Sequence, residues 1–353
     1  MACLLIQWRS LTNSFGTPLR RLAGLGACVA VLAGIEIHEH TGFVREDEWL
    51  PEQKGNLSIP YPSNFSFAVF GDSKRNFACL STILRAVDRD PEIAFAIHTG
   101  DLVGNGKREE FRDFMECVAV DLHKPFFTVA GNHDVTGTGR EPYNEFFGPR
   151  RYVFEVGDAS FIVLDTSQES SLDEAQFQWL EQQLSRSESL SKTLVFMHRP
   201  PYDPRTNDSP ALPPEKAEKL TSLFHKYQVS HVFASHLHAF FEGTWQGVPY
   251  TISGGAGARL HGTDAKVFFF HYLKVNVNDS GVHVQCIPVS ISTSRRAFLE
   301  TWGVIRREGI ELILYGAIAY LSVQLAWSQR TAWWNSPRSV WILIANRCAG
   351  RPA

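Results

Sequence analysis

Side chains able to hold a metal ion follow five separate apolar runs of the sequence. In chain order they are Asp72, Asp101, Asn132, His198, His236 and His238. Each apolar run is short enough for a single buried β-strand. Because ligands of α/β sheets bind where the strands end, we expect these six side chains to gather in one site.

The mixture of donor atoms indicates which cations this site would take. Imidazole nitrogens together with carboxylate oxygens suit Mn²⁺, Fe or Zn²⁺ better than Mg²⁺ or Ca²⁺, which prefer oxygen alone. A carboxylate can bridge two cations about 3.5–4 Å apart, and such pairs promote in-line attack of water on phosphate esters. The residues therefore predict two divalent metal ions and hydrolysis of a phosphorylated small molecule or other phosphoester.

The elements that must position these side chains alternate between apolar runs and amphipathic stretches from residue 66 to about 290. We predict strands at 67–70, 93–97, 126–130, 193–197 and 231–234, each leading to site residues. Further strands are predicted at 152–155, 161–164, 248–252, 272–277 and 282–287, and helices around 80–87 and at 109–122, 172–184 and 214–227. We interpret 137–147 and the proline-rich 200–214 as loops. Gly254–Gly257 lacks the Lys-Ser/Thr of a phosphate loop, so we expect a tight turn behind the site.

The order of the motifs resembles the calcineurin-like metallophosphoesterase superfamily. Its signature is D-x-H, G-D, G-N-H-[DE], an isolated His and G-H-x-H. The matching segments are Gly71–Lys74, Gly100–Val103, Gly131–Asp134, Met197–Arg199 and Ser235–His238. The resemblance covers about residues 65–290. It implies an α/β fold, a four-layer α/β/β/α sandwich with a dinuclear metal centre, and leaves hydrophobic terminal segments outside the domain.

The resemblance also implies a role for each site residue. Asp101 would bridge both metals, with Asp72 and His238 on the first. The second metal would take Asn132, His198 and His236. His133 would be catalytic rather than a ligand, standing beside the leaving group and donating a hydrogen bond or proton to it. His98 is expected to pack or to orient a neighbour.

The sequence departs from the family pattern at the first metal. Lys74 stands where the family has His, and Gly104 stands where purple acid phosphatases have a compensating Tyr. An ammonium group cannot ligate a cation, so we expect Lys74 to pair with Asp72 or to bind the substrate phosphate. Arg75 is a second candidate substrate residue, although exposed basic residues are more often solvated surface. Ser235 replaces the Gly of G-H-x-H, which we expect to matter little.

The two ends of the chain differ from its middle. Residues 22–35 form an uncharged run after Arg20 and Arg21, and acidic residues follow it. We interpret residues 1–50 as a signal-anchor-like segment and linker, with a buried N-terminal helix or a lipoprotein cleavage box as the alternatives. We expect residues 60–292 to form the metallophosphoesterase domain that the resemblance implies. Residues 293–353 are rich in Arg and Trp, and 312–327 predict a membrane-associated or transmembrane helix, with a buried helix closing the domain as the alternative. The catalytic domain would then lie outside the cytoplasm.

Composition excludes several other classes of protein. The 353 residues carry 34 basic and 37 acidic side chains, a net charge of −3, without the basic excess of nucleic-acid binding domains. Six cysteines without a C-x-x-C pair exclude zinc ribbons and thioredoxin-type sites. The leading hypothesis is therefore a membrane-attached metal-dependent phosphatase or phosphodiesterase. The alternative is a catalytically silent binding module of the same fold, which the retained metal-binding residues argue against. The sequence does not predict the oligomeric state.

Overall fold

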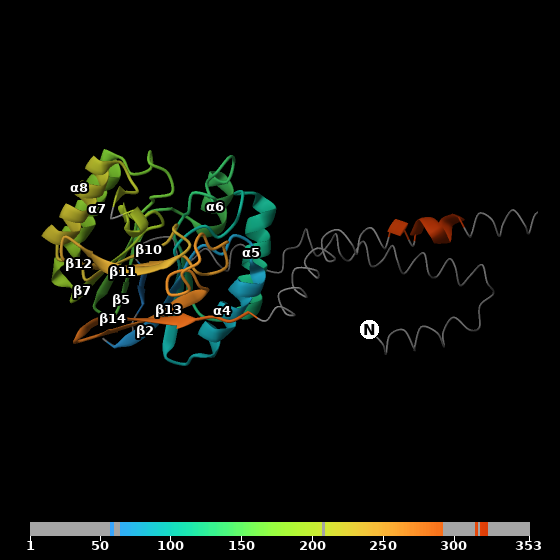
Figure 1. Cartoon of the computed structure of the whole chain (residues 1–353), viewed down its shortest axis with the longest axis horizontal. Coiled ribbons are helices and arrows are strands. Elements are labelled where there is room, and N and C mark those ends of the chain that lie inside the picture. The colour runs from blue at the N-terminus through green and yellow to red at the C-terminus, as the bar shows by residue number, and fades with distance from the viewer. Residues whose placement is uncertain (1–56, 60–63, 207–208, 292–314, 317, 324–353) are drawn as a thin grey trace, which may run out of the picture. The chain divides into compact units, whose positions relative to one another are not determined.

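The computed structural model describes residues 57–59, 64–206, 209–291, 315–316 and 318–323 (Figure 1). The chain divides into two units, residues 44–299 and a second unit that contains 1–43 and 300–353. All labelled strands and helices belong to the first unit. The uncharged run at 22–35 lies outside the described residues.

Two β-sheets form the centre of the first unit. The larger sheet has seven strands in the order β1 (Leu57–Ile59), β5 (Tyr152–Val156), β6 (Ala159–Val163), β7 (Lys192–Phe196), β10 (His231–Ala234), β12 (Val248–Ser253) and β11 (Phe240–Trp245). The smaller sheet has five, in the order β14 (Gly281–Pro288), β13 (His271–Asn278), β2 (Phe65–Phe70), β3 (Ile93–His98) and β4 (Phe126–Thr128). Strands β2, β3 and β4 are parallel, as are β6, β7, β10 and β12, so the carboxyl ends within each group meet at one edge.

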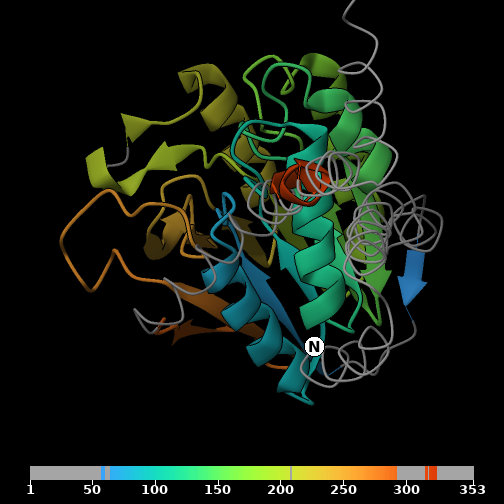
Figure 2. The ribbon, with the colours of Figure 1, turned by 90° about the vertical axis from the view of Figure 1, so that its right-hand side faces the viewer.

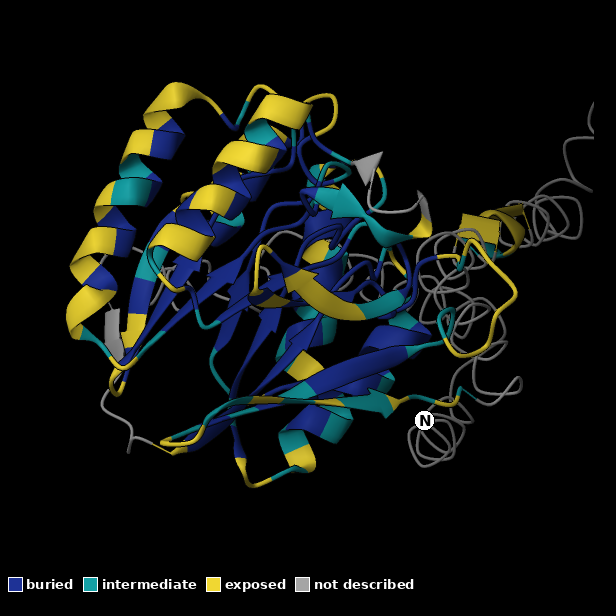
Figure 3. Ribbon diagram, turned by 60° about the vertical axis from the view of Figure 1, so that its left-hand side comes forward, coloured by how far each residue is buried: buried dark blue, intermediate teal, exposed yellow. Residues whose placement is uncertain are grey.

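Helices cover the outer face of each sheet. On the smaller sheet these are α4 (Phe77–Arg89), α5 (Arg108–Asp121) and α6 (Arg140–Phe147), and Figure 2 shows α4 and α5 side by side in front of the strands. On the larger sheet they are α7 (Glu174–Arg186) and α8 (Pro214–Lys226). Figure 3 shows that α7 and α8 expose one face and bury the other. The predicted four-layer α/β/β/α sandwich is confirmed.

The alternation of side chains along the strands explains why the layers stack. On β2, Ala68 and Phe70 pack under α4 and α5, whereas Phe67 and Val69 face the other sheet. The space between the sheets is filled largely by phenylalanine. Phe127 of β4 stacks on Phe154 of β5 with ring centroids 4.1 Å apart, so aromatic contacts join the two sheets directly.

The interpretation of 137–147 as a loop is wrong, because residues 140–147 form helix α6. Tyr143 and Phe147 stand one turn apart and are both buried against α5, which stabilises a helix whose Pro142 and flanking glycines suggest a loop. The segment 200–214 also contains local structure: the two-stranded pair β8 (Tyr202–Asp203) and β9 (Ser209–Pro210), and a 3₁₀ turn at Pro204–Thr206. The strand predicted at 126–130 ends earlier, at Thr128.

Part of the predicted C-terminal helix falls within the described residues. Residues 315–316 and 318–323 are helical, and Tyr315, Tyr320 and Val323 are each more than half exposed. Among the described residues, no helix has both the length and the apolar composition needed to cross a bilayer.

Candidate metal centre

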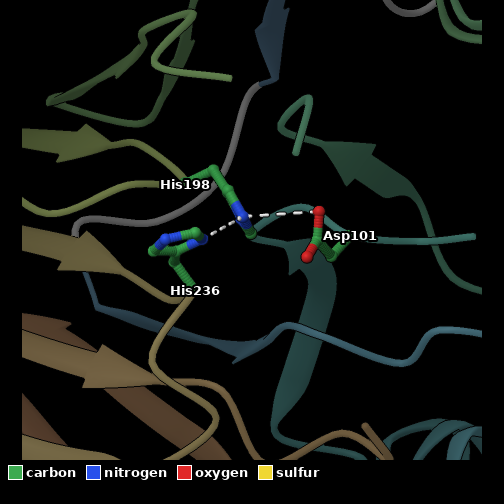
Figure 4. A group of neighbouring side chains, drawn as sticks. All are labelled: Asp101, His198 and His236. Carbon is green, nitrogen blue, oxygen red and sulfur yellow. Dashed lines mark hydrogen bonds and ion pairs between the residues drawn. The ribbon is translucent and has the colours of Figure 1, made fainter. Parts of the chain in front are cut away.

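Two clusters of potential metal ligands share Asp101. One consists of Asp101, His198 and His236, and the other of Asp72, Asp101 and His238. Within each cluster, one ligand atom from every residue lies within 4.8 Å of the others. Figure 4 shows the first of these groups, with His198 between the other two side chains. The predicted gathering of these side chains at the strand ends is therefore found.

His198 holds the centre of one cluster. Its Nε2 atom lies 3.4 Å from Oδ1 of Asp101 and 3.2 Å from Nδ1 of His236. The same nitrogen is 3.1 Å from the amide oxygen of Asn132, which joins the cluster as predicted. Four donor atoms thus converge on a space about the size of one cation.

The other cluster is built around Asp72. Its Oδ1 atom lies 3.4 Å from Nε2 of His238, while Oδ2 accepts a 2.8 Å hydrogen bond from the backbone N–H of His236. The backbone bond fixes the carboxylate so that its second oxygen points into the cluster.

The two carboxylates fit a bound cation. Asp72 and Asp101 are completely buried, yet Oδ1 of Asp72 and Oδ2 of Asp101 make no hydrogen bond. Buried carboxylate oxygens are costly unless a partner compensates for the lost water. Among the described residues, Oδ2 of Asp101 has only the 3.1 Å ion pair with Lys74, and Oδ1 of Asp72 only the 3.4 Å contact with His238. A divalent cation beside each oxygen would complete the compensation.

Backbone carbonyls set the histidine tautomers. Nδ1 of His198 lies 3.0 Å from the carbonyl of Thr99, and Nδ1 of His238 lies 2.7 Å from that of Arg259. A carbonyl only accepts, so each ring donates its Nδ1–H and presents the lone pair of Nε2 to its cluster. This is the arrangement of histidines that ligate metals in proteins.

The donor types divide between the two sheets. The oxygen donors Asp72, Asp101 and Asn132 follow β2, β3 and β4 of the smaller sheet. The imidazoles follow β7 and β10 of the larger sheet. The site therefore forms only where the two sheets meet at their carboxyl ends.

Strained backbone accompanies four of the six residues. Asp72, Asp101, His236 and His238 have φ of 60°, 57°, 71° and 48°, in the left-handed region that non-glycine residues seldom adopt. Such conformations cost about 1–3 kcal/mol each and cluster at functional sites. Sequence patterns carry no signal for them.

Close packing around the loops requires small residues. A Cβ added to Gly131 would lie 2.1 Å from the backbone nitrogen of Asp101, and one added to Gly254 would lie 2.8 Å from Oδ2 of Asp72. The amide of Ala258 donates to the carbonyl of Asp72. The segment 254–257 lies behind the site, as predicted, but the backbone N–H groups of Gly254 and Ala256 donate to Ala239 and Gly71 and do not close a tight turn.

Asp134 holds two ligand loops together, a role that the sequence motif did not reveal. Its Oδ2 accepts from the backbone N–H groups of Asp101 and Gly131, at 2.9 and 2.8 Å, and its Oδ1 accepts from that of Val103 at 3.0 Å. Burial and the neighbouring charge of Asp101 raise the pKa of Asp134, and these three donors oppose that rise.

The charge of Asp101 is favoured by its surroundings. Burial alone would raise the pKa of this carboxyl, but His198, Lys74 and the backbone amide of His133 outweigh burial and lower it. An ionised carboxylate between the clusters is the form that attracts cations.

His98 is not part of either cluster. The backbone N–H of Gly100 donates to its Nδ1 atom, and its Nε2 lies 3.0 Å from the hydroxyl of Ser73. Complete burial lowers the pKa of His98 to about 3, so the ring is neutral. The prediction that it orients a neighbour is consistent with these contacts.

His133 lies beside the clusters without joining them. Its backbone N–H donates to Oδ1 of Asp101 at 2.9 Å, and its ring Nδ1 lies 2.7 Å from the carbonyl of Gly104. The ring is half-buried, and the carbonyl leaves Nε2 as its available atom. Gly104 stands at the position where purple acid phosphatases have a Tyr. Its backbone carbonyl positions the ring of His133.

Lys74 pairs with Asp101, not with Asp72. Its ammonium nitrogen lies 3.1 Å from Oδ2 of Asp101, so the predicted partner is corrected. The backbone N–H of Lys74 also donates to the carbonyl of Asp101, which explains why the side chain reaches this carboxylate. Arg75 forms a 3.0 Å ion pair with Glu110 of α5.

Residues 65–240 match the family described as calcineurin-like phosphoesterase. The chain is 32% identical over 195 residues to a probable cyclic nucleotide phosphodiesterase of Rhodopseudomonas palustris, covering 50% of this chain and 68% of that protein. It is 31% identical over 196 residues to a serine/threonine-protein phosphatase of Mus musculus, covering 48% of this chain and 62% of that protein. The chain belongs to the calcineurin-like phosphoesterase family.

Solved structures agree on the fold. A purple acid phosphatase from yellow lupin superposes with a TM-score of 0.52 at 17% identity, covering 68% of this chain and 56% of the other. GAP50, the anchor in the inner membrane complex of Plasmodium, gives a TM-score of 0.52 at 16% identity, covering 64% of this chain and 85% of the other. The family and the fold therefore define a phosphoesterase with residues able to bind divalent metal.

Proposed function

We propose that this protein hydrolyses phosphate esters with two divalent cations, Mn, Fe or Zn, held by the two clusters. The observation that carries the proposal is the pair of buried carboxylate oxygens without hydrogen bonds, one in each cluster, with Asp101 shared between them. When bound, the cations would lower the pKa of a water molecule and neutralise charge on the phosphoryl oxygens.

The protein's own residues divide the remaining work. Asp101 would touch both cations, while Asp72 and His238 complete one shell and His198 and His236, with Asn132, the other. The carbonyl of Gly104 accepts the Nδ1–H of His133 and fixes the orientation of its ring. The Nε2–H of that ring would donate a proton to the leaving-group oxygen.

Lys74 would bind the substrate phosphate. An ammonium group 3.1 Å from Oδ2 of Asp101 would be repelled by a cation bound to the same carboxylate. Its long, half-buried side chain would then turn toward the negative phosphoryl oxygens. Arg75 is engaged by Glu110 and would contribute positive charge only from a distance.

The test is hydrolysis by the purified full-length chain, with metal content measured in the same preparation. p-Nitrophenyl phosphate and bis(p-nitrophenyl) phosphate separate monoesterase from diesterase activity, which matters because the relatives include proteins named for each. We expect activity that rises with added Mn²⁺. A chain that binds two metals and hydrolyses neither ester would instead be the silent binding module.

We also propose that the terminal segments attach the protein to a membrane, with the catalytic domain outside the cytoplasm. The uncharged runs 22–35 and 312–327 support this, as do the exposed apolar side chains of Tyr320 and Val323. Alkaline extraction and protease protection of the full-length chain in cells test it. Release of the chain into the soluble fraction would contradict attachment.

A further inference from the structure

A polar cavity of about 580 Å³ lies in the first unit, and none of the proposed metal ligands lines it. Its lining comes from α6, from the chain just before β5, and from the region between β6 and α7 together with the first turn of α7. The lining includes Arg140, Asn144, Arg150, Arg151, Asp165 and Gln176. Three arginines around one cavity are not explained by the metal centre or by the hydrophobic core.

Strand register places this cavity near the metal centre. Val163 of β6 pairs with Phe196 of β7, so Asp165 and His198 lie two residues beyond a paired position on neighbouring parallel strands. Thr166 also accepts a 2.9 Å hydrogen bond from the backbone of Arg199. The cavity therefore opens at the same sheet edge as the proposed metal ligands.

Arg150 lies just before β5, the strand that neighbours β6 on the side opposite β7. β5 pairs antiparallel with β6 and begins opposite Val163, so the residues before β5 reach the same edge. With strands about 4.8 Å apart, the start of β5 lies roughly 10 Å from the end of β7. That separation suits one molecule that reaches both the metal centre and the cavity.

The guanidinium of Arg150 has an unused hydrogen-bonding capacity. Its side chain is only 17% exposed, and its Nη1 atom is buried without a hydrogen bond, 3.4 Å from Oδ2 of Asp165. The other oxygen of Asp165 accepts from the backbone N–H of Ser167 at 3.1 Å. Nη1 of Arg150 thus has the Asp165 carboxylate as its ion-pair partner but makes no hydrogen bond, so it can donate to a further acceptor.

The remaining charges favour an anion. Arg140 and Arg151 also line the cavity and are exposed. Arg140 donates to Oε1 of Gln168 at 2.7 Å, and the guanidinium of Arg151 lies over the ring of Trp179, so both carry positive charge that no carboxylate of the described residues is shown to neutralise. Asp173 also lines it, but its carboxylate caps α7 by accepting from the backbone of Gln176 at 2.8 Å. Guanidinium groups bind phosphate through paired, charge-assisted hydrogen bonds.

We infer that this cavity binds a phosphate group, held chiefly by Arg150 with Arg140 beside it. The phosphate is either the second phosphate of an extended substrate or a free phosphate ion. The first source rests on the proposed hydrolase function, whereas the second does not.

Phosphate stoichiometry tests the cavity directly. Inorganic phosphate titrated into the Mn²⁺-loaded full-length protein is expected to bind at two sites per chain. Arg150→Ala and Arg140→Ala should each weaken one site about tenfold or more, whereas Arg150→Lys should retain part of it. Arg186→Ala, at the far end of α7, is the matched control and should change neither site.

Asp101→Asn separates failure of this inference from failure of the proposed function. It should remove the phosphate site at the metal centre and leave the arginine site. If the wild type binds a single phosphate that Asp101→Asn abolishes and Arg150→Ala and Arg140→Ala both retain, the inference is overturned. A single site that Arg150→Ala abolishes would support the cavity and count against the proposed metal centre.

A pair of substrates distinguishes the source of the phosphate. Thymidine 5′-(p-nitrophenyl phosphate) is compared with the same ester carrying a 3′-phosphate. If the cavity takes a substrate phosphate, Arg150→Ala should raise KM for the 3′-phosphorylated ester about tenfold. KM for the ester without the 3′-phosphate should stay within about twofold of the wild-type value. Unchanged KM for both esters, with the second phosphate site lost, would identify free phosphate as the ligand.

Discussion

The ammonium nitrogen of Lys74 lies 3.1 Å from Oδ2 of Asp101, the carboxylate that both ligand clusters share. Oδ2 makes no hydrogen bond, and the lysine is its ion-pair partner. A family position that normally holds a metal ligand therefore holds a cation in this protein. This makes Lys74 the residue whose substitution should be most informative.

Lys74→Ala should raise KM for p-nitrophenyl phosphate about tenfold while metal content stays unchanged, because the ligands are intact and only a charged contact with phosphate is lost. Lys74→His should instead tighten the first metal, since a neutral imidazole donates a lone pair where an ammonium repels the cation. Manganese titration and KM measurements on both variants check this. An unchanged KM in Lys74→Ala would rule out contact with substrate.

Asp101→Asn should lose metal and activity together. A neutral amide oxygen cannot balance two dications, and losing a shared ligand should cost more than the roughly 10–100-fold loss seen for residues that only support ligands. Metal analysis and turnover of one preparation provide the measurement. Asp158→Asn, in the exposed β5–β6 turn, is the control. Full metal content with normal turnover would contradict the assignment.

His133→Ala should lower kcat and leave metal content unchanged. The loss should be about 10²–10⁴-fold for alkyl phosphate esters, whose leaving groups need a proton, and smaller for nitrophenyl esters. His123→Ala removes an exposed histidine and should change neither rate. Equal losses on both kinds of ester would argue against an acid role.

Gly131→Ala should disrupt the metal centre by displacing one of the loops that carry its ligands. The added Cβ would lie 2.1 Å from the backbone nitrogen of Asp101, so the loop after β3 or the loop after β4 must move. Weaker manganese binding in calorimetry and a lower melting temperature are expected. Gly104→Ala is the matched control, because its Cβ would meet no atom nearer than 4.0 Å. Wild-type affinity in Gly131→Ala would show that the loops can adapt.

His231 should make the fold sensitive to acid. Burial lowers its pKa to about 4 from the ordinary 6.5, so below pH 6.5 the unfolded chain takes up a proton that the folded ring refuses. Its contribution to stability is therefore complete above pH 6.5 and is lost as pH falls toward 4, by at most about 1.4 kcal/mol per pH unit. Urea unfolding from pH 4.5 to 7 should show a shallower pH dependence for His231→Gln than for the wild type. Identical slopes would exclude this role.

Much of the site could be predicted because its residues stand at strand ends. The runs before Asp72 and His198 are continuous and apolar, and parallel strands bring their ends to one edge. What the sequence could not supply depends on three-dimensional packing. Nothing in the residue order shows that Asp134 bonds three backbone amides, or that Asp101 adopts a φ of 57°.

The fold shows the same division between local pattern and tertiary contact. The helix containing Leu80, Ile83 and Leu84 follows from helical spacing of apolar residues and is found as α4. The sequence does not predict helix α6, because Pro142 and nearby glycines dominate its local signal. The helix is instead stabilised by the packing of Tyr143 on α5. The partner of Lys74 was also misassigned, because a long side chain can reach either carboxylate.

The division of donors between the two sheets links assembly to metal loading. A partly folded chain with only the smaller sheet would present oxygen donors alone, and one with only the larger sheet would present imidazoles alone. Neither half offers the mixed set that selects a transition metal. Uptake of the cation would therefore report that the two sheets have docked. A misassembled protein would differ from a native one in that its metal centre holds no cation.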